Sequence, residues 1–206
     1  MEICLKIVAK TFSYRHPLFL TSAPSYLFPP PTSIYGLFAA ILGIGKNDVK
    51  ENRKLIKKEI QDKIDDIEFL IQKNVRSRSL GIIRFNADEN KWRRSWFTTM
   101  TYNYVFDLEL ILIIKCEEEL GNKLVESIKN YVSCFTPYLG SSENLIQEIS
   151  LVNKNEIDLS NYIKIKKLRN LTNVERNSNY LRLRLPSAYD EEGNWIYEDW
   201  VLIYKA

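Results

Sequence analysis

The chain has 206 residues, with 29 Lys and Arg against 26 Asp and Glu, so its formal net charge is only +3. This length suits a single domain over residues 1–206, and a hydrophobic content of 45% is enough for a packed core, which excludes an intrinsically disordered chain. A net charge so near zero excludes nucleic-acid binding through bulk charge, although a local basic face remains possible.

No membrane segment, metal or cofactor is expected. The N-terminal stretch carries Glu2 and Lys6 among its apolar residues, unlike a signal peptide, and the longest apolar run, 108–114, is too short to span a bilayer. The cysteines are scattered and His16 is the only histidine, which disfavours a metal site. We therefore predict a cytoplasmic protein without membrane contact, metal or cofactor.

The first part of the chain predicts a strand, a loop and a helix. Apolar and polar residues alternate over 2–10, as in a half-buried strand, and prolines then impose a loop over 13–31. Thr32 or Ser33 is the expected N-cap of a helix whose apolar residues recur at helical spacing over 34–42. This helix is expected to lie in the core rather than at an interface.

The middle of the chain predicts a projecting hairpin. Residues 46–63 are charged and indicate an exposed helix or an ordered loop, after which apolar runs over 67–85 indicate strands. A polar turn at 86–94 separates these from a β-forming stretch at 95–106. We expect the hairpin at about 75–105, although its register cannot be read from the sequence.

A buried strand is predicted at 107–115, followed by a helix within 117–135 and mostly strands from 149 onward. The element order is close to that of an α+β, ferredoxin-like βαββαβ core with an inserted hairpin and a β-rich C-terminal tail.

Two motifs make a family resemblance specific. Phe19, Leu20 and Pro24 precede the first, PPPTSIYGLFAAILGIG at 29–45; the second, PYLGSSE, occupies 137–143 after the predicted second helix. In this order they resemble the signatures of the CRISPR-associated Cas-five family. Ser141 stands where that family has a basic residue. The resemblance therefore does not imply, at this position, the phosphate contact that the basic residue normally makes.

The resemblance implies a RAMP-type, RRM-like fold whose hairpin is the family's thumb. It also implies a non-catalytic subunit of a type I interference (Cascade) complex in antiviral defence. Such a subunit binds the 5′ handle of the CRISPR RNA, caps and nucleates the backbone filament, and contacts the backbone subunit and the large subunit.

Basic residues gather in two stretches, 76–94 and 164–184, the first interleaved with aromatic residues. Arginine and aromatic side chains suit single-stranded RNA, because guanidinium groups pair with phosphates while unstacked bases lie on rings. For any single lysine, a solvated strand face is the alternative. Together with the resemblance, these stretches and the loop after the first strand give the candidate RNA-binding residues: Tyr14, Arg15, His16, Arg76, Arg78, Arg93, Arg94, Lys166, Lys167 and Arg169.

Acidic residues gather near the C-terminus without Lys or Arg among them, namely Asp190, Glu191, Glu192, Glu198 and Asp199. They are interpreted either as a solubilising loop or as a surface that faces a basic partner subunit, and the sequence does not choose between the two.

His16 raises the question of catalysis. Its unperturbed pKa lies near neutrality, so His16 and Tyr14 would be the catalytic residues of a metal-independent endoribonuclease that processes precursor CRISPR RNA, the alternative function. The same residues also suit RNA contact, and His16 could instead hydrogen-bond the loop backbone. The catalytic motifs of the RNA-processing subtype are not found here, so we expect a protein that is not an enzyme.

Overall fold

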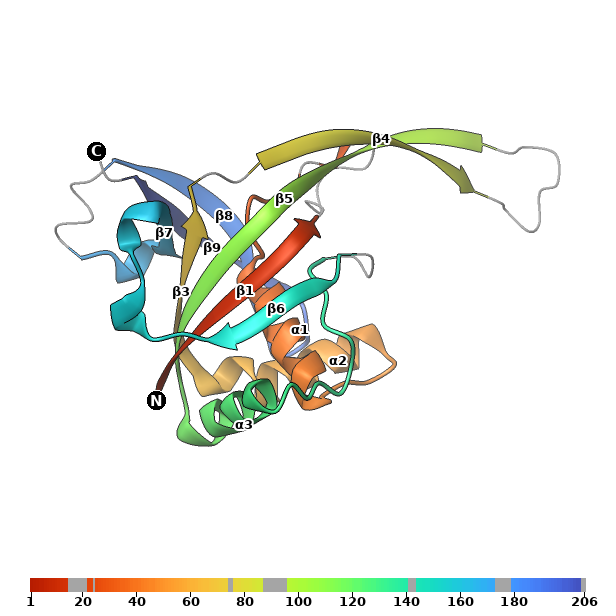
Figure 1. Ribbon diagram of the computed structural model, residues 1–206. Coiled ribbons are helices and arrows are strands. Elements are labelled where there is room, and N and C mark those ends of the chain that lie inside the picture. The colour runs from red at the N-terminus through yellow and green to blue at the C-terminus, as the bar shows by residue number, and fades with distance from the viewer. Residues whose placement is uncertain are drawn as a thin grey trace.

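A largely antiparallel sheet, covered on one face by helices, forms the body of the protein in a computed structural model that describes residues 1–14, 22–23, 25–73, 76–86, 96–140, 144–172 and 179–204 (Figure 1). Its strands are β1 (Glu2–Phe12), β2 (Ser22–Ala23), β3 (Ile64–Gln72), β4 (Arg76–Asn86), β5 (Trp96–Cys116), β6 (Ile146–Leu151), β7 (Tyr162–Lys167), β8 (Asn179–Tyr189) and β9 (Trp195–Tyr204). The helices are α1 (Pro31–Leu42), α2 (Val49–Glu59) and α3 (Glu118–Lys129). The predicted mixture of helices with an antiparallel sheet is confirmed.

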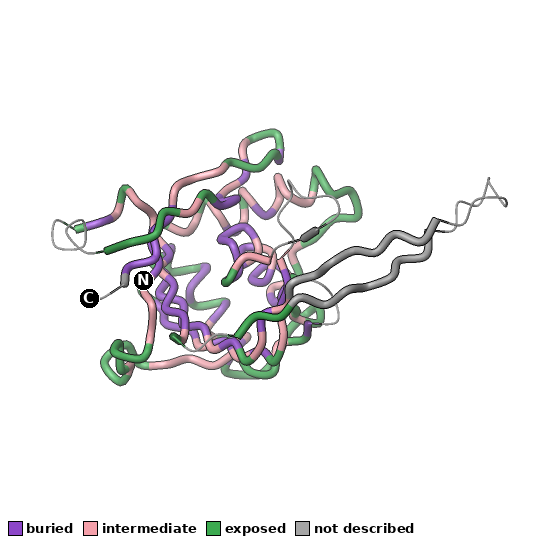
Figure 2. Tube along the Cα trace, turned by 90° about the horizontal axis from the view of Figure 1, so that it is seen from above, coloured by how far each residue is buried: buried purple, intermediate pink, exposed green. Residues whose placement is uncertain are grey.

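The strands follow one another in the order β6-β1-β5-β3-β7-β9-β8, while β2 and β4 pair with β5 off this path. β1 and β5 pair antiparallel in the centre, with Leu5 opposite Leu112. Because side chains alternate along a strand, the odd residues of β1 from Ile3 to Ala9 face the helices and are buried. The buried residues gather between the sheet and the helices (Figure 2).

The helix α1 is buried as the sequence predicted, with Ile34, Leu37, Phe38 and Ile41 in the core. The predicted N-cap is wrong, because the helix begins at Pro31. Proline suits the first helical position since its ring fixes φ and the missing N–H has no intrahelical acceptor there.

The helix α2 begins after Asp48, whose carboxylate accepts a hydrogen bond from the Glu51 N–H. No helix in the described ranges is long and apolar enough to cross a membrane.

A cluster of tilted and edge-to-face aromatic rings joins the C-terminal strands to the body. The Phe69 ring lies 5.4 Å from the ring of Trp200 and 5.5 Å from that of Phe28, and all three side chains are fully buried. Contacts of this kind add about 0.5–1.5 kcal/mol to the effect of burial. They fix β9, β3 and the segment before α1 relative to one another.

A long antiparallel ribbon projects from the body (Figure 1). It consists of β4 and the first half of β5, in a register that runs from Arg76 opposite Phe106 to Asn86 opposite Trp96. Asp107 lies where the ribbon part of β5 meets the sheet part, and its φ of 54° is left-handed. Aspartate tolerates this conformation better than most residues, so the direction of β5 can change there.

Candidate nucleic-acid interface

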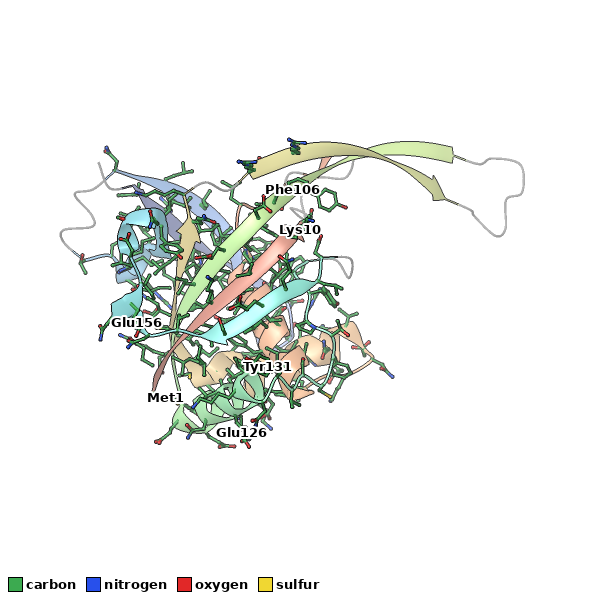
Figure 3. All side chains as sticks on the ribbon, viewed as in Figure 1. Met1, Lys10, Phe106, Glu126, Tyr131 and Glu156 are labelled. Carbon is green, nitrogen blue, oxygen red and sulfur yellow. The ribbon has the colours of Figure 1, made fainter. Side chains whose placement is uncertain are left out.

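The base of the ribbon carries arginine and aromatic side chains on one face. Arg76 and Arg78 are exposed, and their direct partners across the ribbon are Phe106 and Tyr104. Directly opposed residues share a face, so these four side chains form one surface, here called the ribbon-base surface. The surface lies where the ribbon meets the end of β1, since Thr11 is the pairing partner of Phe106; Figure 3 labels Phe106 and, on β1, Lys10.

The two arginine side chains of the ribbon-base surface are available to bind an anionic ligand. Neither Arg76 nor Arg78 forms an ion pair with a carboxylate in the part of the chain that the structure describes. Two guanidinium groups beside two rings fit a single strand of RNA, whose phosphates and bases need both kinds of group.

Four of the predicted site residues, Arg15, His16, Arg93 and Arg94, lie outside the described residues. The hypotheses on them, including the catalytic role of His16, stay predictions.

The basic residues of β7 divide into different environments. Lys166 is buried, and its Nζ lies 3.3 Å from a carboxylate oxygen of Glu68 in β3. Lys164 approaches the other oxygen of Glu68 at 3.2 Å. A buried ammonium paired inside the protein is poorly presented to a ligand, so Lys166 is a weaker candidate than the exposed arginines, and its contact with RNA stays a prediction.

Lys167 and Arg169 share one acidic partner. The Lys167 Nζ lies 2.8 Å from Glu198 and the Arg169 guanidinium 3.6 Å from it. Burial opposes ionisation of Glu198, but hydrogen bonds from Lys167 and Ser187 outweigh it and lower the pKa of this carboxyl. Arg169 is 67% exposed and remains accessible, whereas Lys167 is largely covered.

The acidic residues of β9 therefore face the chain's own basic residues. Glu198 pairs with Lys167, and Asp199 lies 2.5 Å from the guanidinium of Arg182 in β8. These two acids lie in a strand and not in a loop, and antiparallel pairing of β9 with β7 and β8 mixes charges that are separate in the sequence. The interpretation as a surface that faces a partner subunit stays a prediction.

The sheet face away from the helices is similarly neutralised. Lys6 lies 3.1 Å from Glu109, which also accepts a hydrogen bond from the hydroxyl of Tyr162. Burial opposes ionisation of Glu109, yet Tyr162 and Lys6 lower its pKa. The face is occupied by internal pairs and is a poor platform for an added polyanion.

The two sequence motifs meet at one groove, here called the motif groove, with a volume of about 960 Å³. The floor is α1, where Ser33, Gly36 and Ala40 line the space, and Tyr138 and Gly140 of the second motif form one side. Segments that lie far apart in the sequence thus build one concave surface.

The second motif is held against the end of β1. Gly140 has a φ of 88°, and a Cβ there would lie 2.0 Å from the carbonyl oxygen of Ser13. The buried Asn144 accepts a hydrogen bond from the Thr11 hydroxyl at 2.9 Å. These contacts hold the second motif in place against β1. Asn144 takes part in them, and only the three-dimensional arrangement shows this.

Tyr14 connects the same wall to α1. Burial raises the pKa of Tyr14 strongly, although hydrogen bonds with Ser33 and with the Gly140 backbone oppose the rise. The phenol therefore keeps its proton at neutral pH. It can donate or accept a hydrogen bond at the edge of the motif groove.

The opposite wall comes from α2 and the β8–β9 turn. The Arg53 guanidinium lies 4.7 Å from the ring centroid of Trp195, a cation–π contact. Gly193 fixes this turn on α2, because a Cβ there would lie 2.8 Å from the Lys50 carbonyl oxygen. Sequence reasoning missed Arg53 and Trp195, since nothing local connects them.

Among the described residues, no three His, Cys, Asp or Glu side chains gather as metal ligands would.

The comparisons agree with this arrangement. The family model described as CRISPR-associated protein (Cas_Cas5) matches residues 2–193. A solved structure described as a CRISPR RNA-guided surveillance complex is similar with a TM-score of 0.59 and 12% identity, over 98% of this chain and 88% of that chain. Another, described as a Cas protein, has a TM-score of 0.53 and 13% identity over 98% and 95%. No curated protein matches the chain.

The protein thus shares its fold with solved proteins of CRISPR systems. More narrowly, the chain belongs to the Cas5 family.

Proposed function

We propose that this protein is the subunit of a type I CRISPR effector complex that holds the 5′ handle of the CRISPR RNA. The ribbon-base surface carries this proposal, because Arg76 and Arg78 are exposed beside Tyr104 and Phe106 and have no carboxylate partner among the described residues. Family membership and the similarity to a surveillance complex support it.

The topology supports a finer interpretation of the fold. The strands β6, β1, β5 and β3 are neighbours in that order with antiparallel pairing, and α1 and α3 pack on one face. We interpret these elements as a ferredoxin-like βαββαβ core within a single domain, and the ribbon of β4 and β5 as the thumb.

The protein partners follow from the same proposal. A subunit at the 5′ end of the RNA would cap the filament of backbone subunits and contact the large subunit. The near-neutral net charge of +3 supports dependence on assembly, because bulk charge cannot supply tight RNA binding by itself.

We further propose that the protein is not an enzyme. The sequence supports this, because the catalytic motifs of the RNA-processing subtype are not found in it. Incubation of the purified protein with labelled repeat RNA tests it directly. Specific cleavage that is abolished in His16→Ala would overturn the proposal in favour of the endoribonuclease.

RNA recognition is tested with an RNA that carries the repeat-derived handle and with a matched RNA in which the handle is scrambled. Binding is measured by filter retention over a range of salt concentrations, with the full chain and with the complex that co-purifies with it. We expect preference for the handle and weakening with salt, since phosphate contacts release counterions. Equal binding of both RNAs, or no salt dependence, would contradict the proposal.

A further inference from the structure

The motif groove has the properties of a binding site that the ribbon-base surface does not account for. Its volume of about 960 Å³ lies near the upper end of the range of roughly 300–1,000 Å³ that is usual for ligand sites. The groove is open at its centre, because a Cβ placed on Gly36 would meet no atom within 4 Å. A flat group can therefore approach the backbone of α1 closely.

Aromatic rings stand exposed around this space. Phe135, Tyr138 and Trp195 all line the groove and are 54%, 46% and 41% exposed. Their positions are fixed by the backbone. The Phe135 N–H donates to the Ala40 carbonyl at the end of α1, and Tyr138 is bridged to Leu145. Exposed rings on fixed backbone are the means by which proteins stack unpaired bases.

The charge of the groove has one sign. Arg53 and Lys46 are the charged groups among its described lining residues, and no carboxylate belongs to that lining. Arg53 forms no ion pair with a described carboxylate, while Lys46 approaches Glu51 at 4.0 Å. A partly covered, cationic and aromatic site complements an anionic ligand that carries flat rings.

The groove also lies near the ribbon-base surface. Thr11 of β1 is the pairing partner of Phe106, and Tyr14, three residues further along, lines the groove. Three extended residues span about 10 Å, so both surfaces lie at the same end of β1.

We propose that the motif groove binds nucleotides of single-stranded RNA, with bases against Tyr138, Phe135 and Trp195 and phosphate near Arg53 and Lys46. The RNA as ligand depends on the function proposed above, and the groove adds a second contact region on the helix-covered side of the molecule.

A groove-filling variant tests this without removing any contact of the fold. Gly36→Leu places a side chain in the open space, and it is expected to fold because glycine in a helix interior is less favourable than leucine. Gly36→Ala is the matched control, since a single methyl group leaves most of the groove open. Thermal unfolding of both variants checks that the fold is retained.

The probe is a repeat-derived RNA that contains 4-thiouridine, added to the full chain and to its co-purified complex. Irradiation should cross-link it to the peptides that contain Tyr138 or Trp195, as identified by mass spectrometry. Gly36→Leu should lose these cross-links and weaken binding about tenfold, the effect of losing roughly one stacked base, whereas Gly36→Ala should bind like the wild type. Arg53→Gln should weaken binding and reduce its salt dependence.

The outcomes separate the two proposals. If the wild type binds the RNA, but Gly36→Leu binds equally well and the cross-links lie elsewhere, the groove proposal is overturned and the function stands. If neither the chain nor its complex binds RNA, both are overturned. If Gly36→Leu keeps its RNA affinity but loses a protein subunit from the complex, the groove is a protein-docking site and the nucleotide proposal is wrong.

Discussion

Gly140 lies so close to Ser13 that a Cβ on the glycine would stand 2.0 Å from the serine carbonyl oxygen. The contact joins the second sequence motif to the end of the first strand, and it leaves the Gly140 backbone within hydrogen-bonding reach of Tyr14. One close approach thus positions a wall of the motif groove.

Gly140→Ala should therefore destabilise the protein. The alanine would meet both the Ser13 carbonyl and an unfavourable φ of 88°, and we expect a loss of about 2 kcal/mol or more in the free energy of unfolding. Denaturant unfolding measures it. Gly45→Ala is the control, because a Cβ there meets its nearest atom at 3.8 Å. Equal stability of the two variants would show that the turn adapts.

Replacing Arg76 and Arg78 together with glutamine should weaken RNA binding and flatten its salt dependence. Each lost phosphate contact on a single strand lowers the slope of log affinity against log salt by about 0.7, so we expect a decrease of about 1.4. Lys123 and Lys129 of the exposed part of α3 provide a control with the same charge change. An unchanged slope for the arginine variant, or an equal change in the control, would remove the ribbon-base surface from RNA binding.

Lys166→Met should change stability rather than RNA affinity. It leaves the carboxylate of Glu68, which is only 21% exposed, with Lys164 as its remaining partner. We expect a loss of about 1–2 kcal/mol, less than for a carboxylate left wholly unpaired. Arg169→Gln, at a position 67% exposed, should alter stability very little. If Lys166→Met lowered RNA affinity while unfolding at the same temperature as the wild type, Lys166 would be a residue of the RNA interface.

The ion pairs of Glu198 should make the stability of the protein depend on pH. Its pKa is lowered in the folded state, so its contribution is present above the usual value of 4.5 and is lost as the pH falls from 4.5 through the lowered folded value. Comparing thermal unfolding of the wild type and Glu198→Gln from pH 7 to pH 3 should show the wild-type advantage shrinking over this window. A constant difference across the range would contradict the pairing.

Local patterns were enough to predict α1 and the central strands. The spacing of Ile34, Leu37, Phe38 and Ile41 identifies one buried helical face, and tertiary packing then uses that same face. Only the start of α1 was misplaced, because Pro30 occupies the N-cap position without a side-chain hydrogen bond and Pro31 is the first helical residue.

The surroundings of charged residues could not be predicted in this way. Lys166 and Lys167 are neighbours in the sequence, but alternation sends their side chains to opposite faces of β7, one toward Glu68 and the other toward Glu198. Both partners come from other strands, so pairing and register decide which lysine is available. Tyr104 was missed for the same reason, since only the register places it opposite Arg78.

Asp107 lies at the base of the ribbon, where a small change in backbone direction produces a large displacement of the far end. The eleven residues of β4 extend about 36 Å at roughly 3.3 Å per residue, and they pair with the part of β5 that precedes Asp107. A turn of about 10° at that single left-handed residue would carry the far end of the paired strands about 6 Å, a distance larger than the spacing of roughly 4.8 Å between neighbouring strands. Because Thr11 and Phe12 of β1 pair with Phe106 and Val105 just before Asp107, the end of β1 and Asp107 together set the direction in which the ribbon leaves the sheet.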